Sequence, residues 1–85
     1  MQQFTHTISD PNGIHARPAG LLAQQMQAFK STITIKKDEQ SASAKQLIGI
    51  MKMRLKCGQT FTLTAEGEDE TAAIDAAKAF LASNL

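Results

Sequence analysis

The sequence predicts an α+β fold in which three helices cover one face of a mostly antiparallel, four-stranded sheet. Four stretches alternate apolar and polar side chains, as half-buried strands do. Two longer stretches repeat apolar residues at steps of three and four, and a short stretch between them is unusually apolar. These stretches follow in the order β-α-β-β-α-β-α, which gives two strand–helix–strand units and a closing helix. With 85 residues, the chain is expected to form one domain, residues 1–85.

The predicted strands cover residues 4–8, 31–36, 41–44 and 60–65. The third is short and weak, which favours a place at the edge of the sheet. Threonines alternate along the other three strands, so we expect them on an open, solvated face. His6 is in phase with Phe4 and Ile8. We therefore interpret it as a partly buried strand residue rather than a catalytic one.

The predicted helices cover residues 16–29, 45–53 and 70–83. The first and last each carry one apolar stripe for the core. These stripes are Ala19, Leu22, Met26 and Phe29 in the first, and Ala73, Ile74, Ala77, Phe80 and Leu81 in the last. The middle helix is too apolar for a single stripe, because Leu47, Ile48, Ile50, Met51 and Met53 cover more than half of its circumference. Some of them must face water, and an exposed apolar patch on a small protein usually marks a partner site.

Two turns between these elements call for glycine. Residues 9–13 and residues 55–59 each contain one, Gly13 and Gly58, and both are predicted to have positive φ. Cys57 lies in the second turn and is interpreted as a surface or half-buried residue without a redox role. The acidic run at residues 66–70 suits a helix start, where the macrodipole stabilises carboxylates, and needs no catalytic explanation.

The composition argues against several classes of function. Hydrophobic residues make up 42% of the chain, which is normal for a globular protein and argues against disorder. The formal net charge of +1 gives no support to nucleic-acid or membrane binding by bulk electrostatics. The single cysteine excludes an intrachain disulfide and is compatible with a reducing compartment. We read no signal peptide and no membrane span, so a cytoplasmic protein is expected.

The segment at residues 13–20 cannot be explained as ordinary core or surface. His15 stands just ahead of a predicted helix start, Arg17 follows two residues later, and Pro18 suits the first helical turn. Free backbone N–H groups at a helix N-terminus bind anions, and the helix dipole favours negative charge there. A nucleophilic imidazole, a cation and a helix N-terminus together suit one chemistry, in which a phosphoryl group is accepted on the ring and held. Gly20, one turn past Arg17, is poor in a helix interior and leaves either a tight packing contact or a bare surface for a partner.

With these residues identified, the chain resembles the HPr family, the histidine-containing phosphocarriers of the bacterial phosphoenolpyruvate:sugar phosphotransferase system. Residues 12–19, Asn-Gly-Ile-His-Ala-Arg-Pro-Ala, are similar to the active-centre signature of the family, which is highly specific at this distance from the N-terminus. Residues 41–51 and residues 65–70 are similar to two further family segments. The resemblance covers the whole chain and implies an open-faced β-sandwich with three helices on one face.

The resemblance also implies roles for the site residues. His15 would take a phosphoryl group on Nδ1 from phosphorylated enzyme I and pass it to the A domains of sugar-specific enzymes II. Arg17 would steady that group, together with the helix N-terminal amides of Ala16 and Arg17. The protein would be a phosphoryl carrier rather than an enzyme, without metal or cofactor, and a monomer. Both partners would dock on one surface, formed by Ala16, Arg17, Gly20, Leu47, Ile48 and Met51.

One position departs from the family pattern. Many members have a serine directly after the lysine of the second segment, where a dedicated kinase phosphorylates it, whereas this chain has Gln46. Seryl regulation at this position is therefore not expected, and Ser41 and Ser43 are not substitutes because they lie on the predicted short strand. The sequence does not say which sugars would be served.

Three other interpretations remain open. The chain could be a paralogous carrier in a regulatory, nitrogen-type phosphorelay, or a non-phosphorylated binding module that keeps only the docking surface. The presence of both His15 and Arg17 argues against a pure binder. The third is a small α+β domain with an incidental surface histidine.

Overall fold

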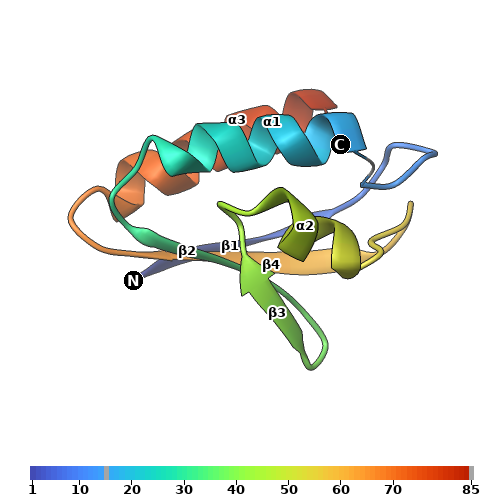
Figure 1. Cartoon of the computed structure of the whole chain (residues 1–85), viewed down its shortest axis with the longest axis horizontal. Coiled ribbons are helices and arrows are strands. Elements are labelled where there is room, and N and C mark those ends of the chain that lie inside the picture. The colour runs from blue at the N-terminus through green and yellow to red at the C-terminus, as the bar shows by residue number, and fades with distance from the viewer. Residues whose placement is uncertain (15, 85) are drawn as a thin grey trace.

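The computed structural model describes residues 1–14 and 16–84. Its elements follow the predicted order and place three helices against a four-stranded antiparallel sheet (Figure 1), which confirms the predicted fold class. The strands are β1 (Gln2–Thr7), β2 (Thr32–Lys37), β3 (Gln40–Ser43) and β4 (Thr60–Glu66). The helices are α1 (Ala16–Gln27), α2 (Leu47–Lys52) and α3 (Glu70–Asn84). Within the described ranges, no helix is long and apolar enough to cross a membrane.

The sheet has the strand order β1-β4-β2-β3, and every neighbouring pair is antiparallel. The last strand in sequence therefore lies at the centre, where it pairs with β1 on one side and β2 on the other. The short β3 lies at an edge, as its weak pattern predicts.

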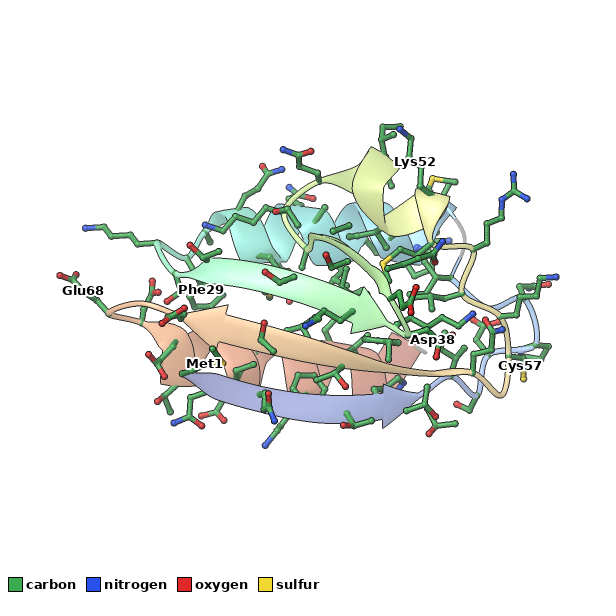
Figure 2. All side chains as sticks on the ribbon, turned by 90° about the horizontal axis from the view of Figure 1, so that it is seen from below. Met1, Phe29, Asp38, Lys52, Cys57 and Glu68 are labelled. Carbon is green, nitrogen blue, oxygen red and sulfur yellow. The ribbon has the colours of Figure 1, made fainter. Side chains whose placement is uncertain are left out.

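The two faces of the sheet differ in polarity, because side chains alternate along each strand. Toward the helices, β2 and β4 present buried apolar residues, which are Ile33, Ile35, Phe61, Leu63 and Ala65. Toward solvent, threonines face one another across the strands, and Thr5 pairs with Thr62 while Thr34 pairs with Thr64. Figure 2 looks onto this open face. The predicted threonine-rich, solvated face is confirmed.

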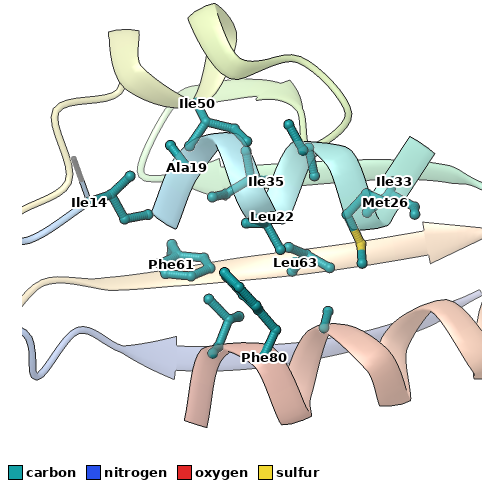
Figure 3. Packing of buried hydrophobic residues seen from close by; sticks show 14 of the residues in the cluster. Ile14, Ala19, Leu22, Met26, Ile33, Ile35, Ile50, Phe61, Leu63 and Phe80 are labelled. Atoms are coloured by element: carbon teal, nitrogen blue, oxygen red, sulfur yellow. The ribbon is translucent and has the colours of Figure 1, made fainter. Parts of the chain in front are cut away.

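The core lies between the sheet and the helices (Figure 3). From α1 it takes Ala19, Leu22, Ala23 and Met26, and from α3 it takes the whole predicted stripe of Ala73, Ile74, Ala77, Phe80 and Leu81. Ile14, which ends the loop before α1, reaches the same core. The core therefore anchors the residue directly before His15.

His6 occupies the position expected for a partly buried strand residue. Its ring lies 5.6 Å from the ring of Phe61 (centroid to centroid), and Phe61 is its partner in β4. Its Nε2 atom is buried and has no hydrogen-bond partner within the described part of the chain. His6 thus belongs to the packing between β1 and β4.

Several predicted boundaries are wrong. The first helix ends at Gln27, because the N–H groups of Ala28 and Phe29 bond the carbonyls three residues back, and Phe29 is only half-buried. The second helix begins at Leu47 rather than residue 45. Before it, Lys45 N–H donates to Ser43 Oγ (3.2 Å) and Gln46 N–H donates to the Ser43 carbonyl (3.2 Å), which makes a turn. The strands shift by one or two residues, and the third helix is one residue longer.

Candidate functional site

His15 lies outside the described residues, so the site is defined by the segments on either side of it. The preceding loop is held by short local bonds. Asn12 N–H donates to Asp10 Oδ1 at 2.8 Å, and Gly13 N–H donates to the Asp10 carbonyl at 2.9 Å. Ile14 N–H then donates to the carbonyl of Leu55 at 2.9 Å. Two consecutive residues, Gly13 and Ile14, are therefore held by backbone hydrogen bonds just before His15.

Gly13 makes this arrangement possible. Its φ of +66° confirms the predicted positive value, which a residue with a side chain would rarely adopt. It also lies directly against the segment between α2 and β4. A Cβ atom at Gly13 would overlap the carbonyl oxygen of Leu55 and lie 2.8 Å from the Cα of Lys56. The loop before His15 is therefore packed against residues 55–57 by backbone alone.

The N-terminus of α1 is open to an anion. The helix begins at Ala16, and both Ala16 and Arg17 are exposed. Its first turn contains no acidic residue, and Pro18 has no N–H group to offer. Within residues 1–14 and 16–84, the Arg17 guanidinium forms no ion pair with a carboxylate. A cation without an ion pair among the described residues and the backbone amides of a helix start are groups that favour a bound dianion.

An apolar patch lies on α2, as its composition predicts. Leu47, Ile48 and Met51 are 36%, 63% and 38% exposed, whereas Ile50 and Met53 are buried. The short helix thus divides its five apolar side chains between the core and solvent. We call the exposed set, Leu47, Ile48 and Met51, the α2 patch.

Gly20 on α1 has no packing reason to be glycine. A Cβ atom there would meet nothing within 4 Å, and the residue is partly exposed. Of the two explanations offered by the sequence, tight packing is therefore wrong. A bare surface on α1 remains the explanation that agrees with the structure.

Two residues near these features were missed in the sequence. Leu21 follows Gly20 and is 41% exposed, so it adds apolar surface on α1. Its signal was its position outside the buried stripe of α1. Arg54 has a positive φ of 51° and precedes Leu55, the anchor of Ile14. Its signal was the absence of any acidic residue between positions 40 and 65.

The other residues singled out in the sequence are Gln46, Cys57 and the acidic run at residues 66–70. Gln46 precedes α2 and makes no side-chain capping bond. Cys57 is exposed, and its thiol lies 3.8 Å from the carbonyl of Ser9.

In the acidic run, Asp69 accepts bonds from Lys30 N–H, Ser31 N–H and the Ser31 hydroxyl. These bonds, the Ser31 hydroxyl first, lower the pKa of Asp69 to about 2. Asp69 therefore acts as a stable anion that ties α3 to the segment before β2.

Among the described residues, no group of three or more histidine, cysteine, aspartate and glutamate side chains is placed to hold a metal ion. The segments on either side of residue 15 instead combine a helix start, a guanidinium without an ion pair among the described residues, and a nearby apolar patch. These groups can hold an anion next to a surface on which another protein can dock.

Comparisons with known proteins agree on one family. A family model described as "PTS HPr component phosphorylation site" matches residues 2–83. The chain is 47% identical over 75 residues to a phosphocarrier protein HPr of Lysinibacillus sphaericus. That match covers 88% of this chain and 83% of the relative. The chain is also 33% identical over 82 residues, 96% of its length, to a multiphosphoryl transfer protein of Xanthomonas campestris, of which it covers 10%.

Solved structures show the same similarity in three dimensions. The crystal structure of HPr-C-His from Thermoanaerobacter tengcongensis superimposes with a TM-score of 0.93 at 38% sequence identity. The match covers 98% of this chain and 93% of that one. The similarity therefore extends over nearly the whole fold.

Proposed function

The chain belongs to the HPr family of phosphocarriers of the phosphotransferase system, and from this membership we propose that His15 is its phosphoryl acceptor. The phosphoryl group comes from the phosphohistidine of enzyme I and goes on to the A domains of sugar-specific enzymes II. The observation that carries the proposal is the open N-terminus of α1, where Arg17 is unpaired within the described residues and no acid occupies the first turn.

The transfer itself needs little chemical machinery. The lone pair of Nδ1 of His15 attacks phosphorus, the new N–P bond forms, and the N–P bond to the donor's histidine breaks. The electron pair of the broken bond returns to the donor's ring. Because one imidazole replaces another, the step needs positioning and neutralisation of the phosphoryl charge rather than an internal base. Arg17 and the amides of Ala16 and Arg17 supply that neutralisation.

The α2 patch supports the second half of the proposal, which is docking. A carrier must bind two partners in turn, so its interface must be modest and reversible. We propose that both partners use one surface composed of Ala16, Arg17, Gly20 and the α2 patch. Its apolar residues are exposed while their neighbours Ile50 and Met53 are buried, so the patch is available without unfolding α2. Methionine at position 51 suits such a surface because its side chain repacks easily.

The test incubates the chain with enzyme I, Mg²⁺ and phosphoenolpyruvate whose phosphoryl group is radiolabelled. We expect one acid-labile phosphohistidine per chain. His15→Ala should remove the label, whereas His6→Gln, which changes the other histidine, should keep it. Label that remains in His15→Ala would show that the acceptor is a different residue.

A further inference from the structure

The near-zero net charge of the chain conceals a strong asymmetry. Between positions 40 and 65 there is no acidic residue, whereas Lys45, Lys52, Arg54 and Lys56 are all basic. Three of these four follow one another within five positions, at the end of α2 and in the segment after it. The segment that packs against the loop before His15 is therefore the most cationic part of this region.

Arg54 holds an unfavourable backbone conformation in this segment. Its φ is +51°, and the only other described non-glycine residue with positive φ is Asp38, at +54° in the turn between β2 and β3. Arg54 N–H donates to the Met51 carbonyl at 3.1 Å, so Arg54 closes the end of α2 in the left-handed conformation. Glycine is the usual residue in such a position because it has no Cβ. A side chain kept in spite of that strain points to a use for the side chain.

The surroundings place Arg54 beside the candidate site. Leu55, its neighbour, accepts the bond from Ile14 N–H at 2.9 Å, and Ile14 is joined directly to His15. The two segments run in opposite directions, because Ile8 N–H donates to the Gln59 carbonyl while Ile14 N–H donates to the Leu55 carbonyl. In the sequence, Arg54 directly precedes Leu55 and His15 directly follows Ile14. Consecutive Cα atoms are only about 3.8 Å apart, so both residues lie one step from the same hydrogen bond.

The charge of Arg54 is available for a ligand. The residue is exposed, and within the described residues its guanidinium forms no ion pair with a carboxylate. The acid in the facing loop is Asp10, whose Oδ1 already accepts a bond from Asn12 N–H. A guanidinium presents several donors in a plane and binds phosphoryl oxygens with more than one hydrogen bond.

We propose that Arg54 is a second guanidinium of the phosphoryl site, which contacts the oxygens of the phosphoryl group while that group is on His15. Arg17 and Arg54 then bind the group from α1 and from the α2–β4 segment, respectively. Arg54 exchanges no proton and forms no covalent bond. The inference rests on the proposed function, since it requires a phosphoryl group on His15.

The decisive variant is Arg54→Gly, because the relief of backbone strain should favour folding while the loss of the guanidinium should slow phosphorylation. Glycine relieves the left-handed conformation, so the free energy of unfolding should stay the same or rise. The rate of phosphorylation by enzyme I should fall about tenfold, the size expected for one charge-assisted hydrogen bond. The hydrolysis half-life of the phosphorylated protein should change as well, and a residue that only assists docking would leave it unaltered.

Three controls isolate the guanidinium. Asp38→Gly relieves the same kind of backbone strain in the β2–β3 turn and should leave transfer unchanged. Lys52→Gln removes an equal charge two residues away, and should slow transfer by no more than about twofold if long-range attraction is minor. Arg54→Lys keeps the charge without the planar donors, so its rate of phosphorylation should lie between the rates of Arg54→Gly and the wild type.

The outcomes separate the two proposals. If the wild-type chain takes no label on His15, the proposed function and this inference both fail. If His15 is labelled and Arg54→Gly matches the wild type in rate and in phosphoprotein half-life, Arg54 is not part of the site and only the inference fails. Equal losses in Lys52→Gln and Arg54→Gly would also overturn it, because they would show a general charge effect.

Discussion

Gly13 and Leu55 lie in backbone contact, and this contact joins the loop before His15 to the segment after α2. Ile14 N–H completes the junction with its 2.9 Å bond to the Leu55 carbonyl. Both proposed guanidinium residues stand close to it in sequence, since Arg17 follows three residues after Ile14 and Arg54 directly precedes Leu55. The geometry of the candidate site therefore depends on a position that tolerates no side chain.

Gly13→Ala should be strongly destabilising. The methyl group would overlap the Leu55 carbonyl oxygen, and φ at +66° disfavours any side chain. We expect the free energy of unfolding to fall by about 2 kcal/mol or more, measured by urea denaturation. Phosphorylation of His15 should slow as well, because the loop cannot keep its contact with Leu55.

Gly58→Ala is the matched control for that variant. Gly58 also has a positive φ, +87°, but a Cβ atom there would meet nothing within 4 Å. Only the backbone term remains, so we expect a loss of about 1 kcal/mol. Equal losses in the two variants would show that the contact with Leu55 carries no energy.

Gly20→Ala should separate folding from docking. With no atom within 4 Å of the new methyl group, the helix gains about 1 kcal/mol from alanine's higher propensity. If Gly20 belongs to the docking surface, the same methyl group should weaken binding to enzyme I, which calorimetry can measure. Gly49→Ala is the contrast, because its Cβ atom would lie 3.3 Å from that of Ala42 and the packing should offset the gain. A Gly20→Ala protein that binds as tightly as the wild type would remove Gly20 from the interface.

Ile48→Glu tests the α2 patch. Ile48 is 63% exposed, so a charge there costs little folding energy, and we expect a loss of stability below about 0.5 kcal/mol. Burying that charge at an interface is far more costly, so the dissociation constant for enzyme I should rise at least about tenfold. Ala79→Glu places the same charge on an exposed position of α3 and should leave binding unchanged. If the two variants bind equally well, the partners dock elsewhere.

Periodicity predicted most of the fold because burial in this chain follows simple faces. The strand β4 and the helix α3 each turn one apolar side toward the same core. The position of a residue along the element therefore determines whether its side chain is buried. The middle helix was harder, since its start depends on bonds that Lys45 N–H and Gln46 N–H donate to Ser43 and that compete with helix formation at these two residues. Such local competition leaves no mark in the hydrophobic pattern.

The candidate site was predictable where it depends on residue type, and less so where it depends on tertiary contact. The excess of apolar residues on α2 indicated an exposed patch, and the structure exposes Leu47, Ile48 and Met51. Arg54 was missed because its proposed role depends on the pairing of Leu55 with Ile14, which joins residues far apart in the chain. His15 lies outside the described residues, so its role stays a prediction from its sequence and its family.

Asp69 should make the stability of this fold sensitive to acid. Its carboxylate accepts bonds from Lys30 N–H and from Ser31, and these bonds lower its pKa from 3.8 to about 2. A carboxyl group with a lowered pKa stabilises the fold fully above its unfolded pKa and loses that contribution as the pH falls through its folded pKa. The wild type should therefore lose stability as the pH drops from about 4 to about 2, beyond the general loss shared with other acids.

Asp69→Asn removes this titration and provides the measurement. At neutral pH the variant should have a lower urea midpoint than the wild type, because a neutral amide binds the two N–H groups and the Ser31 hydroxyl less strongly. The difference between the two midpoints should shrink as the pH approaches about 2, where the wild-type carboxylate becomes protonated. Ser31→Ala removes the largest cause of the shift, so its acid loss should be smaller than that of the wild type and complete at a higher pH. A difference between Asp69→Asn and the wild type that stays constant with pH would show that the Asp69 charge does not stabilise the junction between α3 and the segment before β2.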